Sequence, residues 1–482
     1  MLSNLRQLGR ETVIYGLFAA LPGLAAIIIT PLLTRVLSPA DYGFVATLIV
    51  IVGLLSMFSV LGLDSASGRW FYDHETRAWQ RTIMSTSLWT QLVAAVLIGL
   101  GLALSAGWLA PLLSDSPNAQ TAIVVASLLV PLSVFRGVVG DWLRLRHEAT
   151  RAAAFLAAAA ILTSVGAAVL VILTTTGIVG VFAGQVAGGL LIVIVGLVLF
   201  GRQMSPRNVS RAELPRLLRY GIPLIPAAIA MWVTASSDRV VLTLLRGETD
   251  AALFAVAALV ATAMTLLTMA FRLAWGPFAF SLLSQPQAKQ VFSLVLSWMS
   301  WLSVTLAVLV SALSSVAIRI LATPDYYSAA SAVGYLAFAE VFVILTTIFA
   351  IGANIARTTT PVAVAIFAGA AFNIVLNVLL VPRMGVDGAA LGTLLSFALG
   401  AAVMWWGSQR LTPIDYRLRH VALFLVVGAV LVAIMQRIDG EVLEQTIVRL
   451  LLVLPMLALP FVARLIRPAD LLARLPGYSH PH

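Results

Sequence analysis

The sequence predicts an all-α, polytopic membrane protein with about fourteen transmembrane helices and no water-soluble domain. Two observations carry this prediction. Hydrophobic residues make up 61% of the 482 residues and charged residues only 10%, whereas about 25% of the residues in a soluble domain are charged. The apolar residues also gather into long segments, and about 20 apolar residues in a helix are enough to span the hydrocarbon core of a bilayer.

The apolar segments are bounded by charged residues or by turn residues, and the loops between them are too short to bury a core of their own. They run approximately over residues 12–34, 42–64, 83–106, 119–139, 152–174, 177–200, 217–236, 251–271, 291–313, 330–352, 361–382, 386–408, 419–436 and 446–466. The first segment has no small-residue cleavage site behind it, so we expect it to be a retained helix and not a signal peptide.

The basic residues, 29 Arg and the single Lys289, test the number of helices. Alternating spans place 23 of them on the side that holds both termini and seven on the other side. Because cytoplasmic loops are enriched in Arg and Lys, both termini are predicted to be cytoplasmic, in a bacterial inner membrane. The same bias accounts for the net charge of +10, so we expect no nucleic-acid partner.

Several chemical classes are excluded or disfavoured by what the sequence lacks. It contains no Cys, which excludes disulfides and thiolate chemistry, and its five His residues show no ligand spacing within a helix, so no metal site is predicted. There is no phosphate-binding loop for ATP, no catalytic motif and no large loop to hold an active site. We therefore expect a secondary transporter without a cofactor, and not an enzyme.

An internal repeat divides the chain. Features near the first and seventh apolar segments recur at offsets of 204 or 205 residues, and a glycine pattern before the sixth and twelfth recurs at 208. The matched pairs are Tyr15 with Tyr220, Pro22 with Pro226, Arg35 with Arg239, and Gly177 with Gly385. They predict two six-helix repeats over residues 1–205 and 206–410, followed by two extra helices and a cytoplasmic tail over 411–482. Since six is even, the repeats enter the membrane in the same sense, a transporter design with the substrate site between the halves.

Proline and acidic residues within the predicted spans have two readings each. Pro22 and Pro226 would kink matched helices, either as gates of a cavity or as ordinary membrane prolines that neighbouring groups satisfy. Glu340 lies near the centre of an apolar segment, where a charged carboxylate is unfavourable by about 2.5–3.5 kcal/mol. It is either a coupling-ion or substrate site that faces water, or a structural partner of another buried polar group.

The roles of charged residues at the ends of spans also have more than one interpretation. Arg272 lies in the membrane if its helix continues to Gly276, and is a cytoplasmic flank if the helix ends at Phe271. Asp64 and Arg69 either line the cytoplasmic mouth of a cavity or pair locally. Arg136 fits a plain topology signal. The last group of candidates comprises the Asp238-Arg239 pair at the outer end of the seventh span, and Asn354 with Arg357 after the tenth.

Three motifs carry a family resemblance. They are the stretch from Thr30 to Gly43 (TPLLTRVLSPADYG), the pair Asp238-Arg239, and the run from Asn373 through Asn377, Pro382 and Gly385 to Gly388-Ala389-Ala390. The sequence thereby resembles bacterial oligosaccharide flippases of the O-antigen type, in the superfamily of multidrug, oligosaccharidyl-lipid and polysaccharide exporters. The resemblance covers the whole chain. One departure is Ala252 and Phe254, where the family often has Gly and Tyr.

The resemblance implies a function. Flippases of this kind move an undecaprenyl-pyrophosphate-linked oligosaccharide repeat unit from the cytoplasmic to the periplasmic leaflet by alternating access, for O-antigen or exopolysaccharide synthesis. A pyrophosphate needs Arg donors in a water-filled cavity, for which Arg69, Arg239 and Arg272 are candidates. Asp64, Asp238 and Asn354 are further candidates for lining the cavity, and Glu340 is the candidate for binding the coupling ion.

The resemblance also implies partners: the lipid-linked oligosaccharide, membrane lipids, a polysaccharide polymerase and a chain-length regulator, with the chain itself a monomer. In fourteen-helix lipid II flippases the two extra helices form a groove for the lipid tail, and the last two spans here would do the same.

Three alternatives are weighed against this function. A lipid II flippase is a variant of the same activity. A multidrug or cation antiporter of the same fold usually has twelve helices and an acidic residue in the first, and the first predicted span here has none. A membrane polysaccharide enzyme would need a large catalytic loop.

Overall fold

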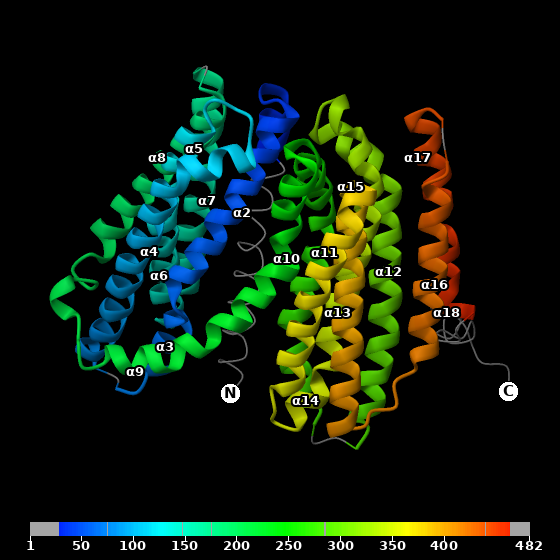
Figure 1. Cartoon of the computed structure of the whole chain (residues 1–482). Coiled ribbons are helices and arrows are strands. Elements are labelled where there is room, and N and C mark those ends of the chain that lie inside the picture. Colours follow the sequence, from blue (N-terminus) through cyan, green and yellow to red (C-terminus); the bar gives the residue numbers. More distant parts are fainter. Residues whose placement is uncertain are drawn as a thin grey trace, which may run out of the picture. The chain divides into compact units, whose positions relative to one another are not determined.

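The computed structural model describes residues 28–462 except residues 75, 147, 175, 284, 285 and 439. Every secondary-structure element assigned within this part of the chain is a helix (Figure 1), which confirms the predicted all-α class. The helices are α2 (Pro39–Val60), α3 (Leu63–Trp70), α4 (Arg77–Leu113), α5 (Ala119–Ser127), α6 (Leu129–Leu145), α7 (Ala149–Leu173), α8 (Gly177–Phe200), η1 (Pro206–Asn208), α9 (Leu214–Gly221), η2 (Ile222–Leu224), α10 (Ile225–Arg246), α11 (Glu248–Ser281), α12 (Ala288–Leu321), η3 (Pro324–Ala329), α13 (Ala330–Phe349), α14 (Ile351–Ile355), α15 (Thr360–Leu411), α16 (Leu418–Met435), α17 (Val442–Leu451) and α18 (Leu454–Val462).

Twelve helical segments among the described residues are long and apolar enough to cross a membrane. The first predicted span, residues 12–34 with Pro22, lies largely outside the described residues. The predicted spans 361–382 and 386–408 both fall within the 52-residue α15, in which Gly385 has non-helical backbone angles. The total of fourteen spans therefore stays a prediction.

Gly385 shows why the backbone turns inside α15. Its φ of 55° lies in the region that glycine adopts without a steric penalty. A β carbon at this position would also lie 2.9 Å from a carboxylate oxygen of Asp250. That carboxylate forms an ion pair with Arg246 over 3.1 Å. The turn thus brings the backbone of α15 against a charged pair at the junction of α10 and α11.

Prolines divide two predicted spans into shorter helices. The predicted span 119–139 is observed as α5 and α6, which meet at Leu128. Pro131 explains the break, because its ring clashes with the carbonyl four residues earlier and it has no N–H to donate. In the predicted span 217–236, Pro223 lies in η2 and Pro226 lies in the first turn of α10. Whether Pro22 and Pro226 act as gating kinks stays a prediction.

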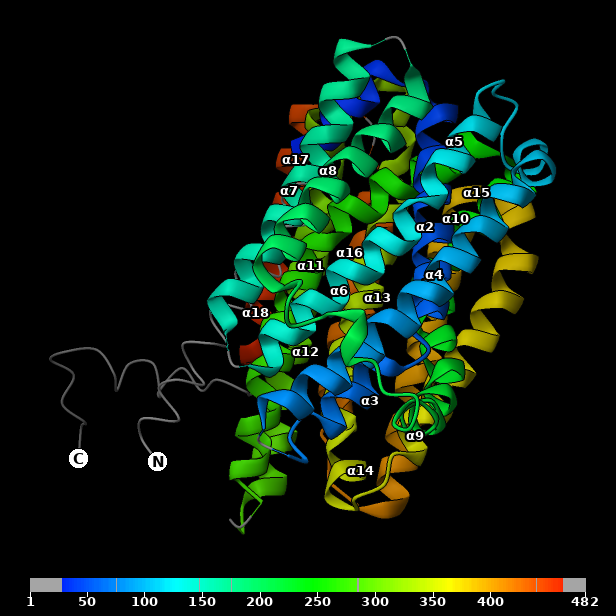
Figure 2. The ribbon, with the colours of Figure 1, turned by 90° about the vertical axis from the view of Figure 1, so that its left-hand side faces the viewer.

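The chain forms two compact units. The first contains residues up to Leu259 together with 321–326 and 374–389, and the second contains 260–320, 327–373 and 390 onward. The sequence-derived division into 1–205, 206–410 and 411–482 stays a prediction. In the first unit α6 packs against α4 and α8 and lies between them (Figure 2).

In the second unit three polar contacts fasten the C-terminal helices to α12. The indole N–H of Trp301 donates to the carbonyl of Met456 in α18 over 2.7 Å. Arg449 of α17 donates to the hydroxyl of Ser315 over 2.8 Å. Ser297 and the Nδ1 atom of His420 in α16 are 3.2 Å apart. The helices beyond the predicted repeats are therefore packed parts of this unit.

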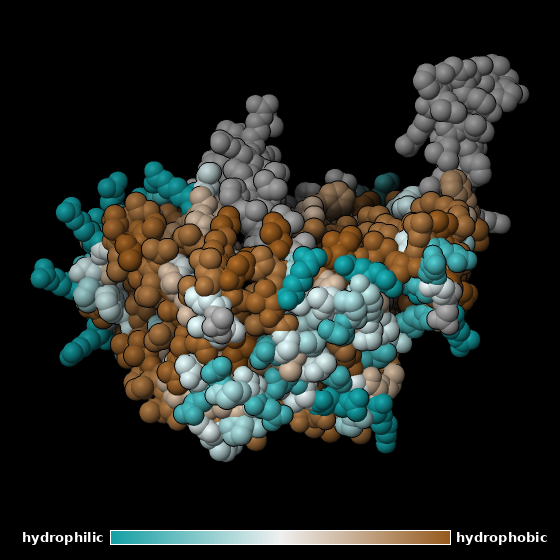
Figure 3. All heavy atoms as spheres, turned by 90° about the horizontal axis from the view of Figure 1, so that it is seen from above, coloured by the Kyte–Doolittle hydropathy of each residue, from teal (hydrophilic) through white to brown (hydrophobic). Residues whose placement is uncertain are grey.

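Hydrophobic residues form large parts of the surface in Figure 3, which views the molecule from above. On α8, for example, Ile194 and Val198 are exposed by 56% and 79%, and on α4 Leu97 and Leu104 by 64% and 79%. Contiguous apolar surface of this extent is not stable against water but matches the hydrocarbon of a bilayer. The chain is therefore a multi-pass membrane protein.

Candidate functional site

A cavity of about 560 Å³ lies inside the first unit. Residues of α2, α3, α4, α6, α7 and α8 line it, and all of these helices except the short α3 belong to segments long enough to span the membrane. Its polar lining includes Asp64, Gln91, Arg136, Asp141, Arg144 and Gln185. Polar and charged groups at membrane depth are unfavourable unless they face water, a partner or a ligand. This cavity is the candidate functional site.

The charge of the cavity comes mainly from α6. Ser133, Arg136, Gly137, Asp141 and Arg144 all line the cavity, and apart from the adjacent Arg136 and Gly137 they follow one another at intervals of three or four residues. Residues three or four apart in an α-helix share a face. A β carbon at Gly137 would meet no atom within 4 Å. The glycine therefore leaves open space beside Arg136, on the polar face of α6.

The two arginines of this face differ in their partners. Arg144 forms an ion pair with Asp141, three residues earlier. Arg136 is half-buried and has no ion-pair partner within 4 Å among the described residues. A guanidinium offers five donors in a planar fork that matches phosphate or carboxylate oxygens. Arg136 therefore provides a cation in the cavity that is free to bind an anionic ligand.

Sequence reasoning missed most of this face. It assigned Arg136 to topology and ended the span at residue 139, which left Asp141 and Arg144 in a loop, but α6 continues to Leu145. The helical spacing of these charges was the available signal.

At the end of α6, the hydroxyl of Tyr72 donates to the carbonyl of Leu145, and partial burial raises the pKa of this phenol above its usual value.

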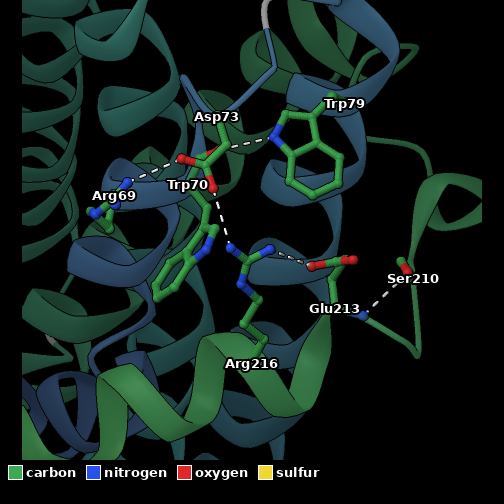
Figure 4. A network of polar contacts seen from close by, with 7 residues as sticks. All are labelled: Arg69, Trp70, Asp73, Trp79, Ser210, Glu213 and Arg216. Carbon is green, nitrogen blue, oxygen red and sulfur yellow. Dashed lines mark hydrogen bonds and ion pairs between the residues drawn. The ribbon is translucent and has the colours of Figure 1, made fainter.

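Of the residues predicted from the sequence, Asp64 lines the cavity and Arg69 does not. Figure 4 shows Arg69 in a polar network that joins α3 to α9. Asp73 accepts from Arg69 over 3.0 Å and from Arg216 over 3.2 Å. Arg216 also pairs with Glu213 over 3.7 Å. The predicted local pairing of Arg69 with Asp64 is replaced by pairing with Asp73.

Trp70 lies at the centre of this network (Figure 4). The guanidinium of Arg216 is 4.9 Å from the centroid of its ring and that of Arg69 is 5.8 Å away. Tyr220 meets the ring edge-on at 5.1 Å, and the carbonyl of Trp70 accepts from the indole of Trp79 over 2.9 Å. Cation–π contacts and ion pairs together hold α9 against α3.

Two glycines complete the contact between α3 and α9. A β carbon at Gly62 would lie 2.2 Å from the carbonyl oxygen of Gly221, and one at Gly221 would lie 2.4 Å from that of Leu61. Gly62 also has a φ of 66°, which disfavours any other residue. The two backbones therefore touch directly, above a small core of Leu63, Ala66 and Leu217.

The candidates of the seventh span lie in a second polar cluster of the first unit. Asp238 accepts from the side-chain amide of Asn377 over 2.6 Å, which joins α10 to α15. Arg239 interacts electrostatically with Asp238 and with Tyr42 of α2. Its Nε atom is buried and has no hydrogen-bond partner among the described residues. Nearby in the chain, the hydroxyls of Thr47 and Thr243 are 2.6 Å apart, a further link between α2 and α10.

Glu340 lies in the second unit and is half-buried in α13. Its two carboxylate oxygens accept from the hydroxyls of Thr265 over 3.2 Å and Thr268 over 2.8 Å, both on α11. Arg272 lies further along α11, which continues to Ser281, so the helix passes through this residue. Arg272 and Asn354 are both exposed, and neither lines the 560 Å³ cavity.

No group of three or more His, Cys, Asp or Glu side chains that could hold a metal ion is found in the described part of the chain. The lining of the cavity offers hydrogen bonding and charge through Arg136, Arg144, the two carboxylates and the amides of Gln91 and Gln185. These groups can bind a polar, anionic molecule inside the membrane.

The helical bundle that surrounds the polar cavity has the fold of solved membrane proteins. The chain has a TM-score of 0.72 with a structure described as "Lipid II flippase MurJ, inward closed conformation", at 12% identity, over 94% of this chain and all of that one. A multidrug resistance MATE family transporter of the MOP superfamily gives 0.57 at 16% identity, over 86% of this chain and 98% of that one.

Sequence comparison identifies the family. The family model described as "Polysaccharide biosynthesis protein" matches residues 8–283, more than half of the chain. The chain belongs to this polysaccharide biosynthesis family, which confirms the resemblance seen in the sequence motifs.

Two curated relatives match parts of the chain. The succinoglycan biosynthesis transport protein ExoT of Rhizobium meliloti (strain 1021) is 31% identical over 230 residues, 47% of this chain and 44% of that protein. The membrane protein MJ1068 of Methanocaldococcus jannaschii is 32% identical over 124 residues, 26% of this chain and 24% of that protein. The matched regions thus span less than half the length of either relative.

Proposed function

We propose that the protein is a flippase for an undecaprenyl-pyrophosphate-linked oligosaccharide repeat unit, which it moves from the cytoplasmic to the periplasmic leaflet for surface polysaccharide synthesis. The observation that carries the proposal is Arg136, a cation without an ion-pair partner in the described structure, on the wall of the polar cavity. Membership of the polysaccharide biosynthesis family and the transport role named for ExoT support the substrate class.

The chemistry of the substrate fits the cavity. A pyrophosphate-linked sugar is anionic and heavily hydroxylated, so it cannot cross hydrocarbon unaided. Arg136 would bind a phosphate oxygen pair, because its fork can donate two parallel hydrogen bonds. Gln91 and Gln185, also on the cavity wall, offer the donors and acceptors that sugar hydroxyls need. Arg144 is partly neutralised by Asp141 and would add a weaker positive potential.

The proposal includes the cellular setting. The protein would lie in the bacterial inner membrane with both termini in the cytoplasm, on the side where 23 of its 30 basic residues fall. Two six-helix repeats, residues 1–205 and 206–410, would alternate access to the substrate. A polymerase and a chain-length regulator would use the product, and the chain would act as a monomer.

The experiment is deletion of the gene, followed by extraction and mass spectrometry of lipids, with a label that reaches only periplasmic glycans. We expect a polyprenyl-pyrophosphate glycan to accumulate unlabelled, and complementation with the wild-type gene to clear it. Complementation with Arg136→Gln should fail, whereas Arg437→Gln, an exposed arginine outside the cavity, should succeed.

The mass of the accumulated lipid identifies the substrate. A repeat-unit glycan supports the proposal, and a lipid-linked cell-wall precursor would replace it with lipid II transport. Normal labelling in the deletion strain, with no second flippase present, would overturn flippase activity and direct the test to drug efflux.

A further inference from the structure

A second, apolar crevice of about 250 Å³ lies on the flank of the first unit. It is bounded by α4, α6 and α8 and by the chain that follows α8. Its lining includes Leu88, Leu92, Phe135, Val193, Leu197 and Met204. The crevice contains almost no polar surface, unlike the cavity described above, so it is suited to hydrocarbon and not to a sugar or a phosphate.

The crevice is separated from the polar cavity by side chains of α6 that pack on glycines of α8. A β carbon at Gly189 would lie 3.0 Å from the side chain of Leu132, the one residue that lines both spaces. A β carbon at Gly196 would lie 2.6 Å from the ring of Phe135. The two glycines let the helices close tightly, so the crevice is a site of its own.

The crevice opens between two helices that face lipid. Leu197, on its rim, is 52% exposed, and its neighbours Ile194 and Val198 on α8 are exposed by 56% and 79%. On α4, Val93 and Leu97 are exposed by 58% and 64%. In a membrane, the molecule beside such a surface is a lipid, and the part of it that fits an apolar crevice is a hydrocarbon chain.

The end of the crevice near residues 201–204 carries basic and amphipathic groups. Trp89 lines the crevice and its indole N–H donates to the carbonyl of Met204 over 2.9 Å, an arrangement typical of the membrane interface. Arg146 donates to the side chain of Gln203 over 3.1 Å and pairs with Glu148 over 3.0 Å. Arg202 is exposed and has no ion-pair partner within the described residues.

We propose that the crevice binds one anionic phospholipid, with an acyl chain between α4 and α8 and the headgroup phosphate at Arg202. Arg146 donates to Gln203 and pairs with Glu148, which Arg151 also contacts over 2.9 Å, so Arg202 is the arginine at this end of the crevice with no acidic partner within the described residues. Basic groups between transmembrane helices at the membrane interface are suited to anionic headgroups. This site is independent of the polar cavity and of the substrate that the cavity carries.

The test uses the absence of Cys in the chain, which makes any introduced cysteine a unique label position. Leu197→Cys, at the rim, is labelled with bimane and reconstituted in vesicles that contain brominated phosphatidylglycerol or brominated phosphatidylcholine. Val198→Cys is the matched control, since it lies on the same helix at the same depth but outside the crevice. Bromine quenches bimane only at short range, so quenching reports which lipid occupies the crevice.

We expect the anionic lipid to quench the label at position 197 at about fivefold lower mole fraction than the zwitterionic lipid, and position 198 to show no preference. Arg202→Gln in the Leu197→Cys background should remove the preference, whereas Arg437→Gln should keep it. Val193→Trp, which fills the crevice, should lower quenching by both lipids, and Val195→Trp on the outer face should not.

Two outcomes would overturn the proposal. One is equal quenching by the two lipids at position 197, or a preference that survives Arg202→Gln. The other is displacement of brominated phosphatidylglycerol by polyprenyl phosphate at a lower mole fraction than by unlabelled phosphatidylglycerol, which would assign the crevice to the substrate lipid. If Arg202→Gln does not yield a monodisperse protein, the Val193→Trp comparison decides the matter.

Discussion

The side-chain amide of Asn377 donates to the carboxylate of Asp238 over 2.6 Å, and both residues are almost completely buried, at 0% and 2% exposure. The two residues are 139 positions apart in the sequence and join α15 to α10 within the first unit. A buried carboxylate is stable only while its hydrogen-bond donors remain in place.

Asn377→Leu should therefore destabilise the protein. The substitution preserves approximate volume but removes a donor from a buried carboxylate, a change that costs about 1–3 kcal/mol, or more for a charged group. Thermal unfolding in detergent, followed by tryptophan fluorescence, measures the shift. Asn354→Leu is the control. Asn354 is exposed in α14, so this substitution should change the free energy of unfolding by less than about 0.5 kcal/mol. Equal midpoints for the two variants would contradict this assignment.

Arg136→Gln should slow transport without destabilising the fold. The glutamine keeps a polar group in the cavity but lacks the charge and the fork, and a charge-assisted hydrogen bond contributes about 1.5–3 kcal/mol. That corresponds to a loss of about tenfold or more in the transport rate, measured as appearance of labelled lipid-linked glycan in the outer leaflet of proteoliposomes. Arg136→Lys should fall between wild type and Arg136→Gln. A wild-type rate for Arg136→Gln would remove Arg136 from the site.

Glu340→Gln should impair transport and leave folding intact. The amide oxygen of Gln can still accept from Thr265 and Thr268, so the contact between α13 and α11 is kept in part while the charge is lost. Transport in vesicles, with and without an imposed proton or sodium gradient, measures the effect. If the well-expressed variant transports normally, Glu340 is a structural partner of the two threonines and not a coupling residue.

Gly221→Ala should disrupt the contact between α9 and α3. The added β carbon would lie 2.4 Å from the carbonyl oxygen of Leu61, a backbone atom that cannot move independently. Overpacking of this kind costs about 1–3 kcal/mol. Gly53→Ala is the matched control, because a β carbon there would meet nothing within 4 Å and alanine favours a helix. Limited proteolysis between residues 201 and 214 should accelerate in Gly221→Ala alone.

Hydropathy was sufficient for spans whose apolar run contains no charged residue. The predicted segment 177–200 coincides with α8 because its apolar run is bounded by a glycine and by Arg202. Hydropathy failed for α6, because Asp141 and Arg144 lower the mean hydropathy of their part of the sequence and so suggest a loop. They extend the helix because they face a polar cavity, which only the packing of six helices creates.

The candidate site was likewise visible only in part. Asp64 was named from the sequence and lines the cavity, but the cavity itself is formed by helices from distant parts of the sequence. Asp73, the partner of Arg69, also pairs with Arg216, which lies 143 residues after Asp73 in the sequence. The position of Pro226 indicated a bend, but the sequence alone did not show that α9 separates from α10 and packs against side chains of α3.

The backbone contact between Gly62 and Gly221 has a mechanical consequence. Where side chains separate two helices, a change of rotamer can absorb a small displacement, but here main chain lies on main chain and nothing compressible lies between them. Gly62 follows α2 and Gly221 precedes α10, so the end of one spanning helix bears directly on the approach to another. A tilt at the start of α10 would be transmitted to the end of α2 almost without loss, as in a rigid joint.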